Sequence, residues 1–420
     1  MPRTLDVYLG RNLTGRLIQD EEGRLAFKYA ETWLDDPQAV PLSRSLPLRQ
    51  EKFNRKECRG FFAGILPEQD KRKTIAQNLG ISAENDFVML ERIGGECAGA
   101  VTFIPAGQTL PSRDDQYRPL SSHELAGILR TLPRRPLMAG EKGIRLSLAG
   151  AQDKIAVRVH DGKISIPLGG APSTHILKPA IERFEGLVFN EFLCMTLAKA
   201  AGISTAHVET GEVGGIDYLL VERYDRSVIP RTSDGPEQPT REHQEDFCQA
   251  LGIVPEQKYQ KVGGPSLKQC FALVREASSA PVLELQSLLD AVIYNALIGN
   301  HDAHGKNFSF LYRGATRLER QTRLAPYYDL VSTIYYPELS EDMAMKIGGE
   351  YLSGKIVPRH FEKLAEEAGL AKPLVRRRVP ELAEIILPGL DAATPRQPDA
   401  VAVAKLIRTR CEQTISRFKE

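Results

Sequence analysis

The densest polar stretch of this chain reads Asn300-His-Asp-Ala-His-Gly-Lys-Asn307. It follows an apolar helical pattern at residues 288–298 and precedes an apolar strand pattern at residues 308–312. The spacing of Asp302 and Asn307 is Asp-x-x-x-x-Asn, as in the protein-kinase catalytic loop. In that loop the aspartate takes the proton of the attacking hydroxyl and the asparagine binds magnesium. The stretch therefore predicts phosphoryl transfer.

A second carboxylate follows downstream in Tyr327-Tyr-Asp-Leu330. Asp329 comes directly after an apolar strand pattern, where a second ligand for magnesium would lie. The structural alternative is that Asp302 and Asn307 form turns and that Asp329 caps a helix. The occurrence of all three residues in this order favours the catalytic interpretation.

The amino-terminal half of the chain must then hold the nucleotide. Lys178 ends an apolar strand, where its ammonium would contact phosphate, and Glu191 in the next helix is its natural ion-pair partner. A solubilising lysine on an edge strand is the alternative. The short loop Gly150-Ala-Gln-Asp-Lys154 can offer backbone N–H groups to phosphate, although it is neither a Walker A loop nor a kinase glycine-rich loop. Val221-Glu-Arg-Tyr-Asp225 ends another strand and has the position of a hinge whose backbone faces adenine.

Composition sets the broad class. A length of 420 residues predicts two or three domains at about 150 residues each. The net charge of +1 is too small to favour nucleic acid or membrane binding by the molecule as a whole. The six cysteines are scattered without a Cys-x-x-Cys pair, which indicates a reducing compartment. Without a signal peptide pattern or an apolar stretch approaching about 18 residues, we expect a cytoplasmic protein that does not contact a membrane.

The period of the apolar residues changes along the chain. Alternation in the first hundred residues, as at 25–29, predicts a small antiparallel sheet, with one helix at residues 75–90. More strands and one helix at 187–201 follow up to residue 224. The remainder is mostly helical, apart from a polar loop at 233–240 and short strands at 308–312 and 323–324. These patterns predict an α+β protein with a β-rich amino-terminal half.

Taken together, these segments resemble the HipA family of serine/threonine kinase toxins from toxin–antitoxin systems. The resemblance rests on seven motifs in the family's order, and Phe61-Phe-Ala-Gly-Ile-Leu-Pro67 is similar to the family's amino-terminal subdomain. The motifs are Ser147-Leu-Ala-Gly-Ala-Gln-Asp-Lys154, Thr174-His-Ile-Leu-Lys178, Asn190-Glu191 with Leu197-Ala-Lys-Ala-Ala-Gly202, Leu219-Leu-Val-Glu-Arg-Tyr-Asp-Arg226, Gln244-Glu-Asp-Phe-Cys-Gln-Ala-Leu-Gly252, Ile298-Gly-Asn-His-Asp-Ala-His-Gly-Lys-Asn-Phe-Ser309 and Ala325-Pro-Tyr-Tyr-Asp-Leu330.

The resemblance implies a two-lobed protein-kinase-like fold, with a β-rich amino-terminal lobe and an all-helical carboxyl-terminal lobe. It implies an amino-terminal β subdomain at residues 1–110, a kinase amino-lobe core with phosphate loop and hinge at 111–238, and a helical lobe with the catalytic loop at 239–420. Asp302 would be the catalytic base, Asn307 and Asp329 the magnesium ligands, and Ser147 the site of autophosphorylation. The residues implied to hold ATP are Ala149, Gly150, Ala151, Gln152, Asp153, Lys154, Lys178, Glu222, Arg223, Tyr224, His304, Gly305, Lys306, Asn307, Tyr328 and Asp329.

The resemblance also implies partners. Family members act with a small helix-turn-helix antitoxin of HipB type, which binds operator DNA and holds the toxin, and characterised members phosphorylate aminoacyl-tRNA synthetases. Two alternatives come from other classes. His301-Asp302, with His243 upstream and Asp329 downstream, matches the metal ligands of HD-type phosphohydrolases. A non-catalytic ATP-binding co-repressor is the other alternative.

Overall fold

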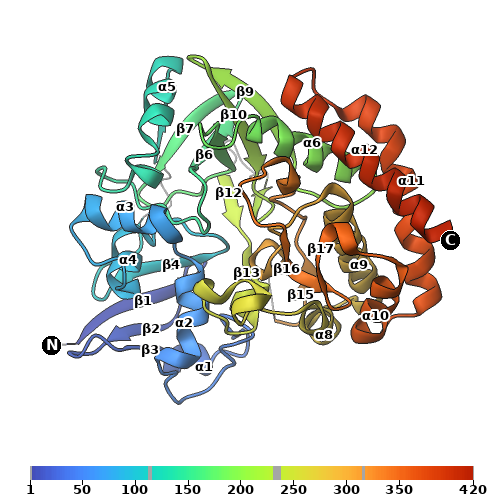
Figure 1. Cartoon of the computed structure of the whole chain (residues 1–420). Coiled ribbons are helices and arrows are strands. Elements are labelled where there is room, and N and C mark those ends of the chain that lie inside the picture. Colours follow the sequence, from blue (N-terminus) through green and yellow to red (C-terminus); the bar gives the residue numbers. More distant parts are fainter. Residues whose placement is uncertain (1, 112–115, 230–237, 315–316, 420) are drawn as a thin grey trace. The chain divides into compact units, whose positions relative to one another are not determined.

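The computed structural model describes residues 2–111, 116–229, 238–314 and 317–419 (Figure 1). The chain divides into two compact units, which are described separately. Unit 1 comprises Met1–Pro179, Gly211–Glu256 and Phe310–Gln321, and unit 2 comprises Ala180–Thr210, Gln257–Ser309 and Thr322–Glu420. The division into parts at 1–110, 111–238 and 239–420 stays a prediction.

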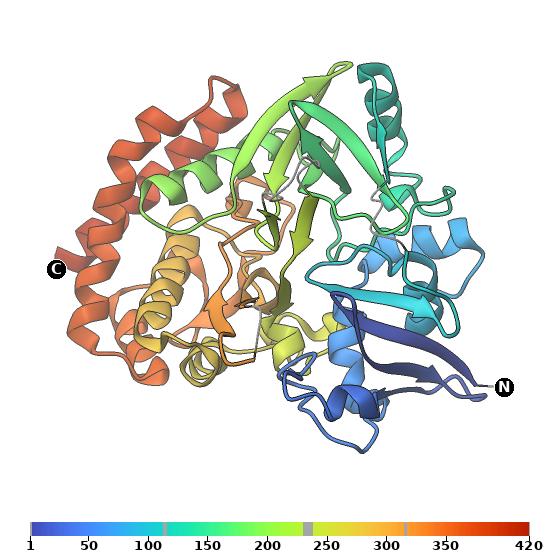
Figure 2. The same ribbon diagram turned by 180° about the vertical axis from the view of Figure 1, so that it is seen from behind.

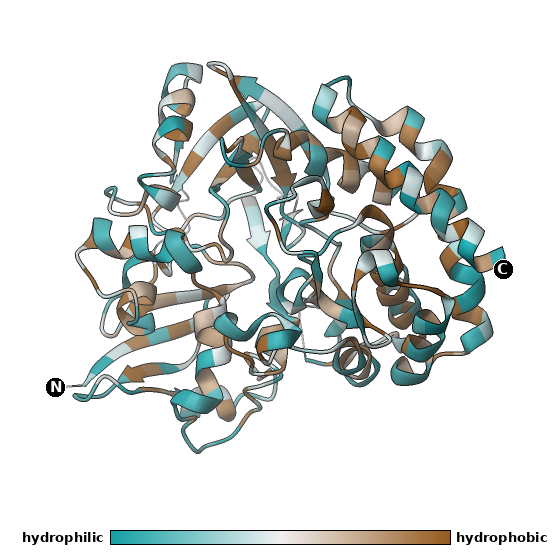
Figure 3. Cartoon of the chain, in the orientation of Figure 1, coloured by the Kyte–Doolittle hydropathy of each residue, from teal (hydrophilic) through white to brown (hydrophobic). Residues whose placement is uncertain are grey.

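Unit 1 begins with a four-stranded antiparallel sheet in the order β3-β2-β1-β4. Its strands are β1 (Arg3–Leu9), β2 (Asn12–Gln19), β3 (Leu25–Tyr29) and β4 (Val101–Pro105). Hydrophobic and hydrophilic residues both occur along them (Figure 3), and in β3 the buried Leu25, Phe27 and Tyr29 alternate with less buried residues, so that one face of this strand is buried. On that face, the ring of Phe62 packs against those of Phe27 and Phe103, with centroids 5.2 and 5.9 Å away. The predicted amino-terminal sheet is thereby confirmed.

Four helices accompany this sheet: α1 (Glu31–Leu34), α2 (Arg55–Gly64), α3 (Gln69–Leu79) and α4 (Asp86–Ile93). The prediction of one helix at residues 75–90 was wrong, because two helices share that region. Gly80 ends α3 in the left-handed conformation, with φ of +64°. Asn85 then begins α4, since its side chain accepts a hydrogen bond from the backbone N–H of Val88.

The second sheet has six strands in the order β5-β7-β6-β8-β10-β9. They are β5 (Gln116–Pro119), β6 (Ile155–His160), β7 (Lys163–Leu168), β8 (His175–Pro179), β9 (Val208–Val213) and β10 (Ile216–Glu222). Strand β8 pairs antiparallel with both β6 and β10, and Leu177 faces Ile155 on one side and Leu220 on the other. Lys178, the next residue, lies opposite Leu219. The strand that carries this lysine is therefore central and not an edge strand.

Shorter elements complete the first unit and the segments next to it: α5 (Ser122–Thr131), η1 (Pro136–Met138), β11 (Arg226–Ile229), β12 (Gln238–Arg241), β13 (His243–Asp246), α7 (Phe247–Ala250), η2 (Pro255–Gln257), β14 (Ser309–Arg313) and β15 (Gln321–Leu324). Strands β14 and β15 confirm the two short strands predicted after residue 300. Of the predicted polar loop at 233–240, residues 233–237 lie outside the described residues, and the rest belongs to β12.

Unit 2 is mainly helical. Its helices are α6 (Leu187–Ala200), α8 (Leu267–Ala277), α9 (Pro281–Ile298), α10 (Pro358–Ala368), α11 (Lys372–Ala393) and α12 (Pro398–Lys419). Helix α11 packs on α6, α9, α10 and α12, and Figure 2 shows α11 and α12 side by side. The unit also contains η3 (Gln260–Val262), η4 (Gly305–Asn307), η5 (Thr333–Tyr335), η6 (Ser353–Lys355), β16 (Asp342–Ile347) and β17 (Glu350–Leu352). An all-helical carboxyl-terminal lobe was therefore too simple a prediction, although the α+β class is confirmed.

Helix α9 carries the catalytic stretch at its carboxyl end. Among the described residues, it is the one helix that is long and apolar enough to cross a membrane by length and composition. The expectation that no segment approaches this length was therefore wrong. Most of the helix is buried inside unit 2, and its apolar side chains, including Leu288, Leu289 and Ile293, are part of the core. Burial in the core accounts for the apolar composition.

Candidate active site

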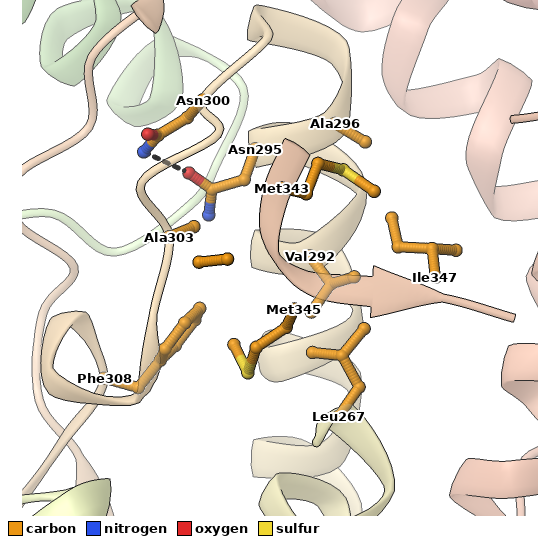
Figure 4. A pocket seen from close by; sticks show the side chains of 11 residues that line it. Leu267, Val292, Asn295, Ala296, Asn300, Ala303, Phe308, Met343, Met345 and Ile347 are labelled. Atoms are coloured by element: carbon orange, nitrogen blue, oxygen red, sulfur yellow. Dashed lines mark hydrogen bonds between the residues drawn. The ribbon is translucent and has the colours of Figure 1, made fainter. Parts of the chain in front are cut away.

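The loop after α9 begins with a sharp turn. Gly299 adopts φ of +70°, and a Cβ atom there would come within 2.6 Å of the side chain of Ile334. This position therefore requires glycine. The next residue, Asn300, donates from Nδ2 to Asn295 Oδ1 on α9 at 2.8 Å and to the backbone oxygen of Asp329 at 3.3 Å. Figure 4 shows the first of these bonds beside a small apolar cavity under the loop. Asn300 thus connects the helix to the segment that carries Asp329.

Asp302 and Asn307 lie within one hydrogen-bonded turn. The side-chain amide of Asn307 donates to the backbone oxygen of Asp302 at 3.0 Å, and the N–H of His304 donates to the same oxygen at 2.8 Å. The N–H of Asp302 donates to Asn300 Oδ1 at 3.1 Å. These bonds fix the backbone of Asp302, while 54% of its side chain remains exposed. The carboxylate is accessible to a hydroxyl group of another protein.

Tyr328 and Asp329 border the same loop. The hydroxyl of Tyr328 donates to the backbone oxygen of Lys306 at 2.8 Å, and it lies 2.6 Å from Ser309 Oγ. Asp329 has φ of +53°, a left-handed conformation that aspartate tolerates better than most residues but that still costs free energy. The turn is held by the bond from Asn300 to the oxygen of Asp329. Strained backbone of this kind occurs preferentially at functional sites.

The charges around His304 show how closely these side chains are grouped. His304 is 5% exposed. Burial lowers the pKa of His304 well below its usual value, and the ammonium groups of Lys258 and Lys306 lower this pKa further. The carboxylate of Asp329 acts in the opposite direction. Unit 2 therefore brings together all of its predicted site residues: Asp302, His304, Gly305, Lys306, Asn307, Tyr328 and Asp329.

The oxygen atoms in this loop suit magnesium better than a transition metal. Across the described ranges, no group of three or more histidine, cysteine, aspartate or glutamate side chains could hold a metal ion. Magnesium differs from zinc or iron because it prefers oxygen ligands and is held by one or two carboxylates together with substrate phosphates. Asn307 and Asp329, with the phosphates of a nucleotide, fit that requirement.

His301 does not have the surroundings of a metal ligand. Its Nδ1 atom lies 3.1 Å from the backbone oxygen of Ser340, and its Nε2 atom lies 2.7 Å from Ser353 Oγ. Both ring nitrogens are therefore occupied by hydrogen bonds within unit 2. His243, the upstream ligand in the phosphohydrolase alternative, lies in unit 1 with Nε2 2.8 Å from the backbone oxygen of Leu42. The hydrogen bonds of His301 therefore speak against this residue as a metal ligand.

In unit 1, the predicted phosphate loop at residues 149–154 is held by the amino-terminal subdomain. Gly150 has φ of +104°, and its oxygen accepts from the N–H of Glu68 at 3.3 Å. A Cβ atom on Gly150 would come within 2.7 Å of Lys154 Nζ, so the lysine lies directly over the glycine. Asp153 is buried and forms an ion pair with Lys71 at 2.6 Å. The side chain of Asp153 therefore fastens the loop to α3.

Ser147, the predicted site of autophosphorylation, is fully buried just before this loop. Its Oγ donates to the backbone oxygen of Ile65 at 3.0 Å, and its N–H donates to the backbone oxygen of Glu96 at 2.9 Å. In this conformation the hydroxyl cannot be reached from solvent. Phosphorylation requires the segment around Ser147 to leave this position.

Lys178 is 5% exposed on the central strand β8, so its ammonium is buried and not a solvated surface charge. Burying a lysine is costly unless the charge interacts with other groups, which agrees with a role in the interior of a site. Glu191 on α6 is 2% exposed. The two residues belong to different units, and the ion pair between them stays a prediction.

The predicted hinge contains a buried ion network. The Arg223 guanidinium donates to Asp225 at 3.0 and 2.8 Å and to Glu96 at 3.1 Å. Arg226 donates to the same Glu96 oxygen at 2.8 Å, and Arg241 Nε lies 3.4 Å from the other. Burial by itself raises the pKa of Glu96, but the three guanidinium groups together lower it to about 2. The side chain of Arg223 is therefore structural, and its backbone is also engaged, because its N–H donates to the oxygen of Thr174 at 2.9 Å and its oxygen accepts from the N–H of Arg226 at 3.2 Å.

The two other hinge residues differ from Arg223. Glu222 is exposed at the end of β10, opposite His175 of β8. The hydroxyl of Tyr224 donates to Gln244 Oε1 in the same unit. Neither Glu96 nor Arg241 was predicted from the sequence. The sequence signal that could have pointed to Glu96 is a glutamate placed between glycines and a cysteine in Gly94-Gly-Glu-Cys97.

The chain has the α+β, kinase-like fold class, and comparison with known proteins gives the family. Residues 5–104 match the HipA N-terminal domain, and residues 146–388 match the HipA-like C-terminal domain. Because the second match alone covers more than half of the chain, this chain belongs to the HipA family.

Individual relatives agree with this assignment. A putative kinase, Y4mE, of Sinorhizobium fredii is 47% identical over 91% of this chain and 90% of its own length. The serine/threonine-protein kinase toxin HipA of Shewanella oneidensis is 32% identical over 92% of this chain and 91% of its own. A chain in the solved complex of Shewanella oneidensis HipA, HipB and operator DNA has a TM-score of 0.85 and 29% identity, covering 99% of this chain and 98% of that one. The family is thus one of kinases and kinase toxins.

Proposed function

We propose that this chain is a serine/threonine-protein kinase toxin that transfers the γ-phosphoryl group of ATP to a hydroxyl group of a cellular protein. By this activity it inhibits growth or promotes persistence. The observation that carries the proposal is the grouping of Asp302, Asn307 and Asp329 in one loop system with the Asp302 carboxylate exposed. The identity of 32% to a kinase toxin over most of the chain supports it.

In the proposed reaction, Asp302 accepts the proton of the acceptor hydroxyl. The hydroxyl oxygen forms a bond to the γ-phosphorus, the bond to the bridging oxygen breaks, and ADP leaves. Asn307 and Asp329 would hold Mg²⁺, which neutralises charge on the phosphate oxygens. Their side chains supply oxygen ligands, and the buried Lys306 adds positive charge close to them.

ATP would be bound by the residues that the family resemblance implies. Backbone groups of residues 149–154 and the ammonium of Lys178 would contact the phosphates, and the backbone of residues 222–224 would face adenine. The remaining contacts would come from His304, Gly305, Lys306 and Tyr328. Support for this assignment comes from the buried position of Lys178 and from the neutral state of His304 that its lowered pKa implies.

Ser147 is proposed as a second acceptor, in an autophosphorylation that inactivates the kinase. A phosphate adds about −1.5 to −2 charge. The buried site that Ser147 occupies, bonded to the oxygens of Ile65 and Glu96, has no room for such a group without displacement of the loop. Displacement of residues 149–154 would remove the contacts to ATP.

We further propose a cytoplasmic toxin–antitoxin module. The relative of known structure forms a complex with HipB and operator DNA, and a HipB-type antitoxin is proposed here as the partner that contacts DNA. An aminoacyl-tRNA synthetase is the substrate class that the family resemblance implies.

The proposal is tested by incubating the purified chain with γ-labelled ATP and magnesium, with and without whole-cell extract. We expect label on the chain itself and on at least one protein of the extract. Release of inorganic phosphate dependent on a tightly held transition metal would favour the phosphohydrolase. Bound ATP with no transfer to any protein would favour the non-catalytic co-repressor.

A further inference from the structure

A tyrosine outside the motifs described above contacts the carboxylate of Asp302. The hydroxyl of Tyr259 donates a hydrogen bond to Asp302 Oδ1, and the two oxygens are 2.6 Å apart. Both residues belong to unit 2. A hydrogen bond of this length to an ionised acceptor is of the strong, charge-assisted kind. The contact therefore acts directly on the group proposed as the base.

The backbone around Tyr259 is built to hold it in place. The oxygen of Tyr259 accepts from the N–H groups of Val262 at 3.0 Å and Gly264 at 2.9 Å. At Gly264, a Cβ atom would come within 2.5 Å of the backbone oxygen of Gln257, so the close turn requires glycine. Gln260, the residue after Tyr259, accepts a hydrogen bond at its side-chain Oε1 from the N–H of Lys346 on β16 at 2.9 Å. This short segment is thus fastened to itself and to a strand.

The ring of Tyr259 is fixed as well. It meets the ring of His304 edge to face, with centroids 5.3 Å apart and planes at 80°. Lys258 Nζ lies 5.4 Å from the centroid of the same ring. The hydroxyl is therefore presented from a packed ring, whereas the carboxylate that accepts its hydrogen bond is 54% exposed. The packing of this ring thus fixes the hydroxyl that donates to Asp302.

We propose that Tyr259 is a positioning residue for the catalytic base, and that its hydrogen bond to Oδ1 of Asp302 orients the carboxylate toward the substrate hydroxyl. This inference rests on the proposed function of Asp302. An exposed aspartate side chain samples several rotamers, and a donor on one oxygen reduces that freedom. A near-attack geometry depends on such restriction.

The test compares Tyr259→Phe with the matched control Tyr335→Phe. Tyr335 donates to Asp399 Oδ1 at 2.7 Å, so the control removes a tyrosine–aspartate hydrogen bond of similar length at a different place in unit 2. The readout is the rate of label transfer from γ-labelled Mg-ATP to the chain and to extract protein, measured as a function of ATP concentration. For Tyr259→Phe we expect a roughly tenfold lower rate at saturating ATP. The KM for ATP should be unchanged, because the hydrogen bond acts on the base and not on the nucleotide.

Tyr335→Phe should match the wild type in rate and in KM for ATP. A Tyr259→Phe protein with the wild-type rate would overturn the inference, and so would a faster one, since that would mean that Tyr259 blocks the base. A loss that comes only from a higher KM for ATP would overturn it as well. Equal losses in both variants would also overturn it. An Asp302→Asn protein measured in parallel separates the two claims: if it transfers label normally, the proposed function of Asp302 is wrong, whatever Tyr259 does.

Discussion

The side-chain amide of Asn307 donates a hydrogen bond of 3.0 Å to the backbone oxygen of Asp302. The five-residue spacing in the sequence is therefore the length of a closed turn, in which one end fixes the backbone of the other. The side-chain oxygen of Asn307 takes no part in this bond. The turn can thus hold Asp302 for proton transfer and still offer an oxygen ligand to magnesium.

Substitutions of Lys178 and Asp329 should impair phosphoryl transfer in different ways. Lys178→Ala should weaken ATP binding and lower turnover, because a buried ammonium on β8 would orient the phosphates. Asp329→Ala should instead raise the magnesium concentration needed for half-maximal transfer. Magnesium titrations at fixed ATP check this, with Lys163→Ala, on the exposed start of β7, as the control for loss of a lysine. If the magnesium concentration for half-maximal transfer rises equally in both variants, the division of roles between Lys178 and Asp329 is wrong.

Ser147 should be modified slowly and with a loss of ATP binding. The hydroxyl is buried, so transfer to it depends on opening of the segment that Ile65 and Glu96 hold. Incubation of the wild type with Mg-ATP, peptide mass spectrometry and ATP titration before and after modification provide the check. Ser147→Ala should not inactivate itself. Phosphate found only at other residues, or full ATP affinity with Ser147 modified, would contradict the proposed self-inactivation through Ser147.

Operator binding should require the antitoxin. A net charge of +1 gives the chain little electrostatic attraction for DNA as a whole. Basic residues at 130–135, where α5 ends, can add local phosphate contacts within a complex. Gel-shift titrations of the chain with and without a HipB-type protein check this. Sequence-specific, salt-resistant binding by the isolated chain would refute the prediction.

The ion network at the hinge should make unit 1 sensitive to acid. The pKa of Glu96 falls from an ordinary 4.5 to about 2 on folding, so its stabilising contribution is complete above about pH 4.5 and is lost as the pH falls toward 2. Glu96→Gln should lower the free energy of unfolding at pH 7 by roughly 3–5 kcal/mol, because three buried guanidinium groups lose a shared partner. Urea denaturation at several pH values measures this.

The control for that experiment is Glu22→Gln, which removes an exposed ion pair with Arg24 in the same unit. Exposed pairs contribute little, so its unfolding midpoint should stay close to that of the wild type. If the two variants unfold alike, the network does not carry the stability assigned to it. If the wild type and Glu96→Gln differ by the same amount at pH 7 and near pH 2, the assigned titration is wrong.

The sequence predicts the parts of this molecule that depend on local pattern. The strand at 25–29 and the helix at 187–200 follow from alternation and from helical spacing. The single helix expected at 75–90 is wrong because apolar spacing continues across Gly80 and Asn85, although Gly80 ends one helix and Asn85 caps the next.

The residues of the site also fall into two groups: those that lie in one local turn and those that tertiary packing brings together. Asp302 and Asn307 are found by spacing because they lie in one turn. Tyr259 is 43 positions away from Asp302 and carries no motif of its own, and Glu96 meets Arg223 across 127 positions. Contacts of that kind are made by tertiary packing, which one sequence does not disclose.

The most direct test of the account is label transfer by Asp302→Asn. The amide has nearly the shape of the carboxylate but cannot accept the proton of the substrate hydroxyl. Transfer from γ-labelled Mg-ATP to the chain and to extract protein should be abolished, growth arrest on expression should disappear, and ATP binding and thermal unfolding should match the wild type. A variant that keeps more than about a tenth of wild-type transfer would contradict the assignment of Asp302 as the base.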